Sequence, residues 1–264
     1  MTEGRNESVA EPRRADEISR SGIRFSICSL VTDVGEYAEM VESFRGRGFS
    51  GPDCEYLYLD NSAGNGFDAF SGYNLFLDRA VGEYLILCHQ DILLLEEGRE
   101  ALEARLAELD RLDPAWALCG NSGGVVDGGL AIRITDPHGA DQSRGRFPAR
   151  ALALDENFIV ARRDANLALS SDLAGFHLYG AELCIVADLL GRSAYVVDFH
   201  LRHKSAGNID ARFYAARRAM IAKYRHAFRT RWIRTTCTHF LISGTPLLGR
   251  ILSTRLGRLF RRSA

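Results

Sequence analysis

Apolar positions in residues 22–120 switch repeatedly between strand spacing and helix spacing. Short β-rich runs predict strands at 23–31, 54–59, 83–88 and 116–119. Helical spacing predicts helices at 35–45, 67–80 and 96–109. Strands that alternate with helices predict an α/β fold, in which a mostly parallel sheet is flanked by helices.

The part of the chain after residue 120 is less regular. Residues 125–150 are rich in Gly and Arg and predict an extended loop or an irregular hairpin. Two β-segments that meet at residues 155–157 are expected within 151–162. A helix is expected at 181–190 and a last strand at 193–199. The Gly-rich segments 64–66 and 120–124 match neither a Walker loop nor a dinucleotide fingerprint, which argues against nucleoside-triphosphate hydrolysis and NAD binding.

Charge divides the chain into three parts. Residues 1–21 are polar, lack hydrophobic periodicity and predict a disordered leader. Residues 211–264 hold 13 Lys and Arg and no Asp or Glu. The rest of the chain therefore carries the other 20 basic residues and all 34 acidic residues, a net charge of −14. We expect a domain at 22–210 and a basic helical extension at 211–264.

The basic extension predicts helices over 211–234 and 246–262. Apolar residues share one face of the second helix, at Leu248, Ile251, Leu252, Leu256 and Leu259. Two interpretations stay open: a helix packed on the domain with a solvated basic side, or an amphipathic helix lying on an anionic membrane. The absence of acidic residues in this stretch favours the membrane. That location would suit an enzyme acting on a lipid-linked or cell-envelope glycan.

The cysteines and the N-terminus bear on the compartment. The six cysteines are dispersed without CxxC spacing, which predicts reduced, buried thiols and a reducing compartment. No secretory signal pattern and no stretch long enough to span a bilayer is found in the sequence. We therefore expect a cytoplasmic protein, peripheral on the inner face of the membrane, and no nucleic-acid partner for its acidic body.

Acidic residues follow three of the predicted strands, at Asp33, Asp60 and Asp91. Ligands of such sheets bind at the carboxyl ends of the strands, so these side chains could hold ribose hydroxyls, a base edge or a divalent cation. Helix capping is the competing interpretation for Asp33, and turn formation competes for Asp60. A cap is also open to Asp91, but its place after a long apolar run favours a functional role.

An ordered set of short motifs accompanies these acids. The motifs are Thr32-Asp33, Asp60-Asn61-Ser62, Gly72-Tyr73-Asn74, His89-Gln90-Asp91, Gly175–Cys184 and His203–Gly207. Together they resemble the family-two-like glycosyltransferases of GT-A fold, in particular the subgroup with an HQD-type motif in place of DxD. The resemblance covers roughly residues 23–207 and implies a nucleotide-sugar-dependent transferase.

The resemblance assigns roles to individual residues. It implies that Asp91 and His203 hold a divalent cation, Mn²⁺ or Mg²⁺, and that Glu182 is the catalytic base of an inverting transfer. His177 and Tyr179 are candidate acceptor contacts, with packing as the open alternative. Donor contacts are expected from Thr32, Asp33, Asp60, Asn61, Asn74, His89, Gln90, Arg202 and Lys204. The implied partners are a nucleotide-sugar donor and a glycan or lipid-linked acceptor.

The sequence departs from the family pattern at His89, which stands where the first acid of DxD is usual. This departure leaves open a catalytically silent module that binds a nucleotide sugar or glycan. Glu182 also fits a first-turn acid that stabilises its helix. A sugar nucleotidyltransferase is a third hypothesis, but no Gly-rich basic loop follows the first strand.

Overall fold

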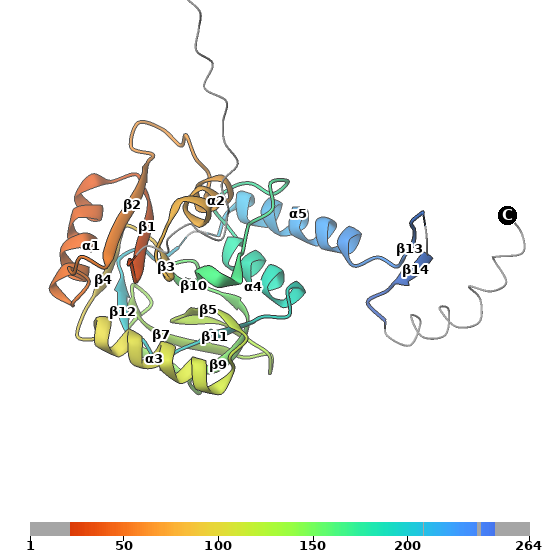
Figure 1. Ribbon diagram of the computed structural model, residues 1–264. Coiled ribbons are helices and arrows are strands. Elements are labelled where there is room, and N and C mark those ends of the chain that lie inside the picture. Colours follow the sequence, from red (N-terminus) through yellow and green to blue (C-terminus); the bar gives the residue numbers. More distant parts are fainter. Residues whose placement is uncertain (1–21, 208, 237–238, 246–264) are drawn as a thin grey trace, which may run out of the picture.

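The computed structural model describes residues 22–207, 209–236 and 239–245 and shows one large sheet with helices on both faces (Figure 1). The elements of the first half are β1 (Phe25–Val31), α1 (Val34–Gly46), β2 (Cys54–Asp60), α2 (Ala69–Arg79), β3 (Tyr84–Cys88), β4 (Ile92–Leu94), α3 (Arg99–Leu112), β5 (Trp116–Gly120) and β6 (Ser122–Val125). Those that follow are β7 (Leu130–Asp136), β8 (Gly139–Arg144), β9 (Ala149–Leu154), β10 (Phe158–Arg162), α4 (Tyr179–Leu189), β11 (Ser193–Val196), β12 (Leu201–His203), α5 (Ala211–Ala227), β13 (Arg231–Arg234) and β14 (His239–Ile242).

The sheet has the strand order β2-β1-β3-β10-β5-β11-β9-β6-β7-β12-β4, with β8 paired to β7. Strands β2, β1 and β3 are parallel, so the ends of the first two, Val31 and Asp60, lie side by side. Parallel pairing also joins β5 to β11 and β7 to β12. The predicted α/β class, with helices flanking the sheet, is confirmed. The sheet itself is mixed rather than mostly parallel, because its other strand pairs are antiparallel.

Antiparallel pairing prevails where the connections are short. β7 and β8 are separated by two residues, and β6 and β7 by four, which is too few for the crossover that a parallel pair needs. The hairpin expected within 125–150 is therefore present as β7 and β8. The two β-segments expected at 151–162 are β9 and β10, which pair with other strands and not with each other. The Gly-rich residues 120–124 contain the end of β5 and the start of β6. Gly123 permits this strand, because a Cβ there would lie 2.2 Å from the carbonyl oxygen of Ala153 on β9.

Apolar side chains pack on both faces of the sheet. Along β1, Ile27 lies in the cluster that contains Met40 of α1 and Leu106 of α3. Cys28 points the other way, into the cluster with Phe76 of α2 and Leu183 of α4. This alternation is the strand period of two. Each fully buried large aliphatic or aromatic side chain contributes about 1.5–3 kcal/mol through removal of apolar surface from water.

The predicted extension is part helix and part hairpin. Residues 211–227 form α5, but the helix expected up to residue 234 ends there, because Arg231–Arg234 pairs with β14. The predicted leader at 1–21 and the predicted amphipathic helix at 246–262 lie outside the described residues. No helix among the described residues is both long and apolar enough to cross a bilayer. The described cysteines are free thiols, as predicted: Cys28, Cys54, Cys88, Cys119 and Cys184.

Candidate functional site

Three side chains that can bind a metal ion meet beyond the carboxyl end of β3. His89 Nδ1 lies 3.2 Å from His203 Nε2, and Asp91 Oδ1 lies 3.3 Å from the same nitrogen. Their ligand atoms all lie within 4.8 Å of one another. Asp91 and His203 are buried, with 8% and 9% of their surface exposed, and His89 is half-buried. The sequence predicted Asp91 and His203 as metal ligands, and the structure places His89 with them.

Backbone contacts position this cluster. β3 ends one residue before His89, whose N–H donates to the carbonyl of Asn157 at 3.0 Å. β4 begins directly after Asp91 and pairs antiparallel with β12, which ends at His203. The N–H of Ser205 then donates to Asp91 Oδ2 at 3.1 Å. Segments about 110 residues apart in sequence are thereby held together by strand pairing.

Charge and burial set the protonation of the cluster. Burial would raise the pKa of Asp91, but the hydrogen bond and charge of His203, the charge of His89 and a bond from Ser205 hold that pKa well below its usual value. Burial, and next the nearby His203, lower the pKa of His89. Asp91 is therefore ionised and His89 neutral near pH 7, which are the forms that coordinate metals.

The donor set fits a divalent cation. One carboxylate and two imidazoles suit first-row divalent ions such as Mn²⁺, with coordination positions left for phosphate oxygens and water. The Tyr179 hydroxyl lies 3.1 Å from His89 Nε2, which leaves Nδ1 facing His203. Tyr179, predicted as an acceptor contact, is itself buried, and its hydroxyl also donates to the carbonyl of Glu156. Its observed role is to orient His89.

Gln90 belongs to the same segment but contacts a different element. Its Oε1 accepts from the N–H groups of Thr32 and Asp33 at 2.7 and 3.0 Å, and its Nε2 donates to the Thr32 hydroxyl at 3.0 Å. The carboxylate of Asp33 caps α1 by accepting from the N–H groups of Gly35 and Glu36. These three predicted donor contacts therefore hold the ends of β1 and β3 together, on the edge where the metal cluster lies.

The loop after β2 is held by its own side chains. Asp60 accepts from the backbone and hydroxyl of Ser62, which is the turn interpretation of this residue. That bonding lowers the pKa of the exposed Asp60 carboxyl. Asn61 is buried and exchanges two hydrogen bonds with the backbone of Phe67. The second oxygen of Asp60 is left to meet a ligand at this edge.

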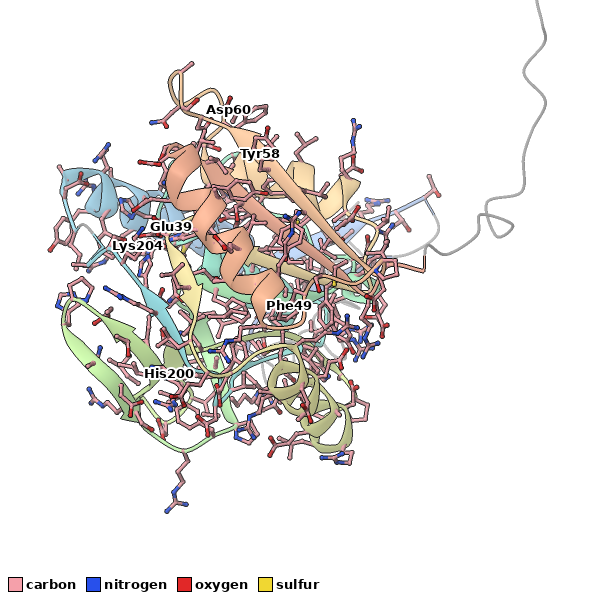
Figure 2. The ribbon with its side chains drawn as sticks, turned by 90° about the vertical axis from the view of Figure 1, so that its left-hand side faces the viewer. Glu39, Phe49, Tyr58, Asp60, His200 and Lys204 are labelled. Atoms are coloured by element: carbon pink, nitrogen blue, oxygen red, sulfur yellow. The ribbon has the colours of Figure 1, made fainter. Side chains whose placement is uncertain are left out.

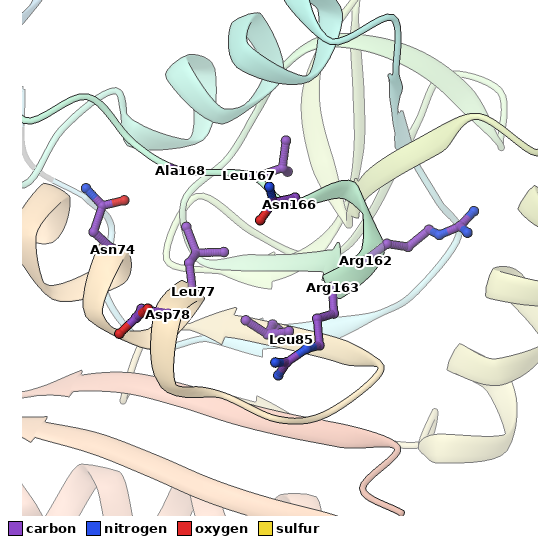
Figure 3. A pocket seen from close by; sticks show the side chains of 9 residues that line it. All are labelled: Asn74, Leu77, Asp78, Leu85, Arg162, Arg163, Asn166, Leu167 and Ala168. Atoms are coloured by element: carbon purple, nitrogen blue, oxygen red, sulfur yellow. The ribbon is translucent and has the colours of Figure 1, made fainter. Parts of the chain in front are cut away.

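Asn74, predicted as a donor contact, bridges two parts of the chain. Its amide exchanges hydrogen bonds of 2.8 and 2.7 Å with the backbone of Leu169. It also lines a pocket of about 310 Å³ together with Arg163 and Leu85 (Figure 3). The structure brings neither Asn74 nor this pocket into the metal cluster, whose residues do not line it.

The two predicted basic donor contacts differ in their surroundings. Lys204 lies beside α1 (Figure 2), where its ammonium pairs with Glu36 and Glu39 at 3.2 and 3.0 Å. These pairs raise the pKa of Lys204. Arg202 is exposed on β12, one residue before His203. Because successive side chains of a strand point to opposite faces, Arg202 lies on the other face of β12 from His203. The charge of Lys204 is already compensated.

Glu182, predicted as the catalytic base, is fully buried in the first turn of α4. Its Oε2 accepts from the N–H of Ser170 at 3.0 Å, and its Oε1 accepts from the Tyr224 hydroxyl at 3.1 Å. These contacts join α4 to α5 and to the loop before α4. A base must touch the acceptor hydroxyl, so the catalytic role of Glu182 stays a prediction.

A groove beside α5 includes one predicted acceptor contact. The groove has a volume of about 710 Å³, and His177, Phe176 and Leu173 line it opposite small residues of α5. The His177 ring meets the edge of Phe213 with centroids 5.6 Å apart. The groove is mainly apolar, so it would suit an apolar part of a ligand better than a bare sugar.

Glu156 is a candidate site residue that the sequence did not reveal. N–H groups of Leu178, Tyr179 and Gly180 at the start of α4 bond its carboxyl group. Burial, and next the charge of Asp155, nonetheless raise the pKa of Glu156 to about 8. The only signal in the sequence is an acid pair between two β-segments. Its proximity to α4 appears only once β9 and α4 are placed together.

Comparisons with known proteins were made for the sequence and the structure. No protein-family model matches the chain. A protein of Fuscovulum blasticum described as "ATP synthase subunits region ORF 6" is 37% identical over 244 residues, which is 90% of this chain and 96% of that protein.

Two solved structures share the fold. The mannosyltransferase PcManGT from Pyrobaculum calidifontis, in complex with GDP-Man and Mn²⁺, matches 89% of this chain and 70% of its own, with a TM-score of 0.52 and 11% identity. S. aureus TarS 1–349 in complex with UDP-GlcNAc matches 76% of this chain and 66% of its own, with a TM-score of 0.50 and 13% identity. The chain therefore has a GT-A-like glycosyltransferase fold.

Proposed function

The chain belongs to the family of the Fuscovulum blasticum protein "ATP synthase subunits region ORF 6", and we propose that it is a nucleotide-sugar-dependent glycosyltransferase. It would move a sugar from a nucleotide-sugar donor to a glycan or lipid-linked acceptor. The observation that carries the proposal is the cluster of His89, Asp91 and His203 at the carboxyl edge of β3. In α/β sheets this edge is where ligands bind.

The structural neighbours support a donor of this class. PcManGT is bound to GDP-Man and Mn²⁺, and TarS 1–349 is bound to UDP-GlcNAc. Both neighbours contain a nucleoside diphosphate linked to a sugar. We propose the same chemical class for this chain, without choosing the base or the sugar. Membership of the HQD-motif subgroup is part of the proposal.

The proposed mechanism assigns separate tasks to the residues of the cluster. His89, Asp91 and His203 would hold a divalent cation, which supplies positive charge to the departing nucleoside diphosphate. Asp60 would accept from the nucleoside, and Gln90 keeps Thr32 and Asp33 in place around it.

The acceptor would approach from the side of His177. The groove between this residue and α5 is the apolar cavity on that side, and it suits the lipid part of a lipid-linked acceptor. An inverting outcome remains part of the proposal. NMR of the first product formed would show the opposite anomer to the donor, and retention of the donor anomer would exclude inversion.

The first test is thermal-shift binding of nucleoside diphosphates and nucleotide sugars, with and without Mn²⁺. One nucleotide class should stabilise the chain, by about 2.7 kcal/mol at a ligand concentration of 100 times Kd. Mn²⁺ should strengthen the effect. Asp91→Ala should abolish the Mn²⁺-dependent part, because it removes the only carboxylate of the cluster.

Asp78→Ala is the matched control, since it removes an exposed carboxylate that pairs only with its neighbour Arg79. This control should respond to nucleotides as the unchanged chain does. No stabilisation by any nucleotide would exclude a nucleotide-sugar transferase. Equal Mn²⁺ effects in both variants would remove Asp91 from the metal site.

A catalytically silent module is the second candidate function. The burial of Glu182 favours it, because protein groups bond both oxygens of the predicted base. The two candidates differ in turnover. Release of nucleoside diphosphate from the stabilising donor, in the presence of acceptor glycans, supports the transferase. Binding without release supports the module.

A further inference from the structure

α5 is attached to the domain along one side only. Tyr224 is its one buried residue, and its hydroxyl bonds Glu182. Lys223 pairs with Asp172 on the same side of the helix. Figure 1 shows α5 leading away from the sheet toward β13 and β14, which lie apart from it. Most of the helix surface therefore faces outward.

A stripe of exposed side chains runs along one face of α5. It consists of Tyr214, Arg218, Ile221, Arg225 and Phe228, all exposed. Their spacing of four, three, four and three residues places them on one face of a helix. The apolar members expose 47%, 48% and 52% of their surface. The stripe thus alternates apolar side chains with guanidinium groups over the full length of α5.

The positive charge of α5 and the β13–β14 hairpin, together called the arm, is not compensated within the described chain. Six exposed or half-buried arginines form no salt bridge with a described carboxylate: Arg217, Arg218, Arg225, Arg229, Arg231 and Arg234. No Asp or Glu occurs after Asp210 in the sequence. The body before it is acidic, so the arm and the body present opposite charge.

The β13–β14 hairpin also exposes apolar and basic side chains. β13 and β14 have four residues each and, among the described strands, pair with one another alone. A two-stranded hairpin of this kind is marginal in water unless it packs on another surface. Phe240 and Ile242 expose 44% and 43% of their surface, and Arg234 is exposed as well.

We propose that α5 and the β13–β14 hairpin form a docking surface for an anionic lipid bilayer. Apolar side chains that alternate with arginines suit the boundary between lipid headgroups and acyl chains. The apolar side chains insert there, and the arginines contact lipid phosphates. A polyanion without an apolar layer would leave Ile221 and Phe228 in water. The surface is distinct from the predicted helix at 246–262, and it would place the groove at His177 beside the membrane.

Flotation of the full chain with vesicles tests the surface. The chain should float with vesicles of phosphatidylcholine and 30% phosphatidylglycerol at about 0.1 M salt, and remain behind with phosphatidylcholine alone. Arg218→Gln with Arg225→Gln should weaken the partition about tenfold. Ile221→Ser with Phe228→Ser should weaken it as well. Arg144→Gln with Arg146→Gln, two exposed positions on and next to β8, is the charge-matched control.

A second readout uses intrinsic fluorescence. The chain has two tryptophans, of which Trp116 is fully buried in the domain and Trp232 on β13 is 47% exposed. Anionic vesicles should therefore shift the emission to shorter wavelength, and Trp232→Phe should remove the shift. Neither readout needs a nucleotide, so failure of the glycosyltransferase proposal would leave this one standing.

Three outcomes would overturn the proposal. The first is equal partition of the unchanged chain and the stripe variants, which would place any membrane contact elsewhere. The second is absence of flotation with anionic vesicles. The third is a dimer in solution that the stripe variants dissociate, which would make the surface an interface between two copies.

Discussion

At the scale of single residues, the ring of His89 depends on one neighbour for its orientation. The Tyr179 hydroxyl is 3.1 Å from His89 Nε2, and it also contacts the Tyr73 hydroxyl at 3.3 Å. Outer-shell partners of this kind typically change metal affinity by about 10–100-fold. Tyr179→Phe should therefore weaken Mn²⁺ binding by at least about tenfold, measured by titration calorimetry, while the chain stays folded.

Tyr73→Phe is the control for this prediction, because it changes the same buried hydroxyl pair without touching His89. It should bind Mn²⁺ nearly as the unchanged chain does. Equal weakening in both variants would mean that the hydrogen bond between the two hydroxyls matters, and that the bond to His89 adds nothing to it.

Part of this metal cluster could be predicted from the sequence. Asp91 ends a long apolar strand and His203 follows the last one, so both could be assigned to the same sheet edge. His89 was expected to contact the donor, because the position of its Nδ1 beside His203 depends on contacts between segments distant in sequence. Gln90, next to both His89 and Asp91, turns away from them because its amide bonds the segment between β1 and α1.

At the scale of elements, side chains expected to bind ligands also hold helices in place. Asp33 caps α1, and Asn74 joins α2 to the backbone at Leu169. Capping and ligand binding favour the same polar residues at the same strand ends. A single sequence therefore cannot separate the two uses, because the difference lies in which backbone N–H groups lie within reach.

Substitution of Asp33 can separate these roles. Asp33→Ala should lower the free energy of unfolding by about 1 kcal/mol, since two N–H groups at the start of α1 lose their acceptor. Asp33→Asn should keep most of the cap. Urea midpoints at unchanged slope measure both effects. If Asp33→Asn is stable but loses the nucleotide-induced thermal shift, the charge of Asp33 contacts the donor.

Glu182 gives the second prediction at this scale. Glu182→Leu leaves the Ser170 N–H and the Tyr224 hydroxyl without their acceptor, and Tyr224→Phe leaves one carboxylate oxygen without its donor, so each should destabilise the chain by about 1–3 kcal/mol. The double variant should cost less than the sum, because both remove the same contact between α4 and α5. Glu182→Gln can keep both contacts, because its amide oxygen accepts from Ser170 and its amide N–H donates to the Tyr224 hydroxyl. Unchanged stability with lost turnover in Glu182→Gln would support Glu182 as the base.

At the scale of the whole molecule, four of the first five strands and the helices between them were predictable, and the strand order was not. Residues 22–120 show clear periodicity, and β1, β2, β3 and β5 lie within one or two residues of their predicted bounds. The antiparallel insertion of β10 between β3 and β5 depends on contacts distant in sequence. Short strands such as β4 and β12 carry too few residues for a periodic signal.

Global stability should depend on pH through Glu156. Its pKa is about 8 in the folded chain against a reference value of 4.5. Between these values the folded chain binds more protons than the unfolded chain, so the free energy of unfolding falls as the pH rises, on the order of 1 kcal/mol per pH unit. Asp91 has the opposite effect, because its pKa is lowered in the folded state. Its contribution to the free energy of unfolding is lost as the pH falls into the acid range.

Urea unfolding of the full chain from pH 5 to pH 8 measures this dependence. Glu156→Gln should flatten the profile, because an uncharged side chain of the same shape has no proton to lose. Asp155→Asn should move the fall to lower pH, since the Asp155 charge contributes to the raised pKa, and the acceptor for Asn157 is kept. An unchanged slope in Glu156→Gln would show that this carboxyl is ionised in the folded chain. The N–H groups at the start of α4 would then bond an ionised carboxylate rather than a neutral acid.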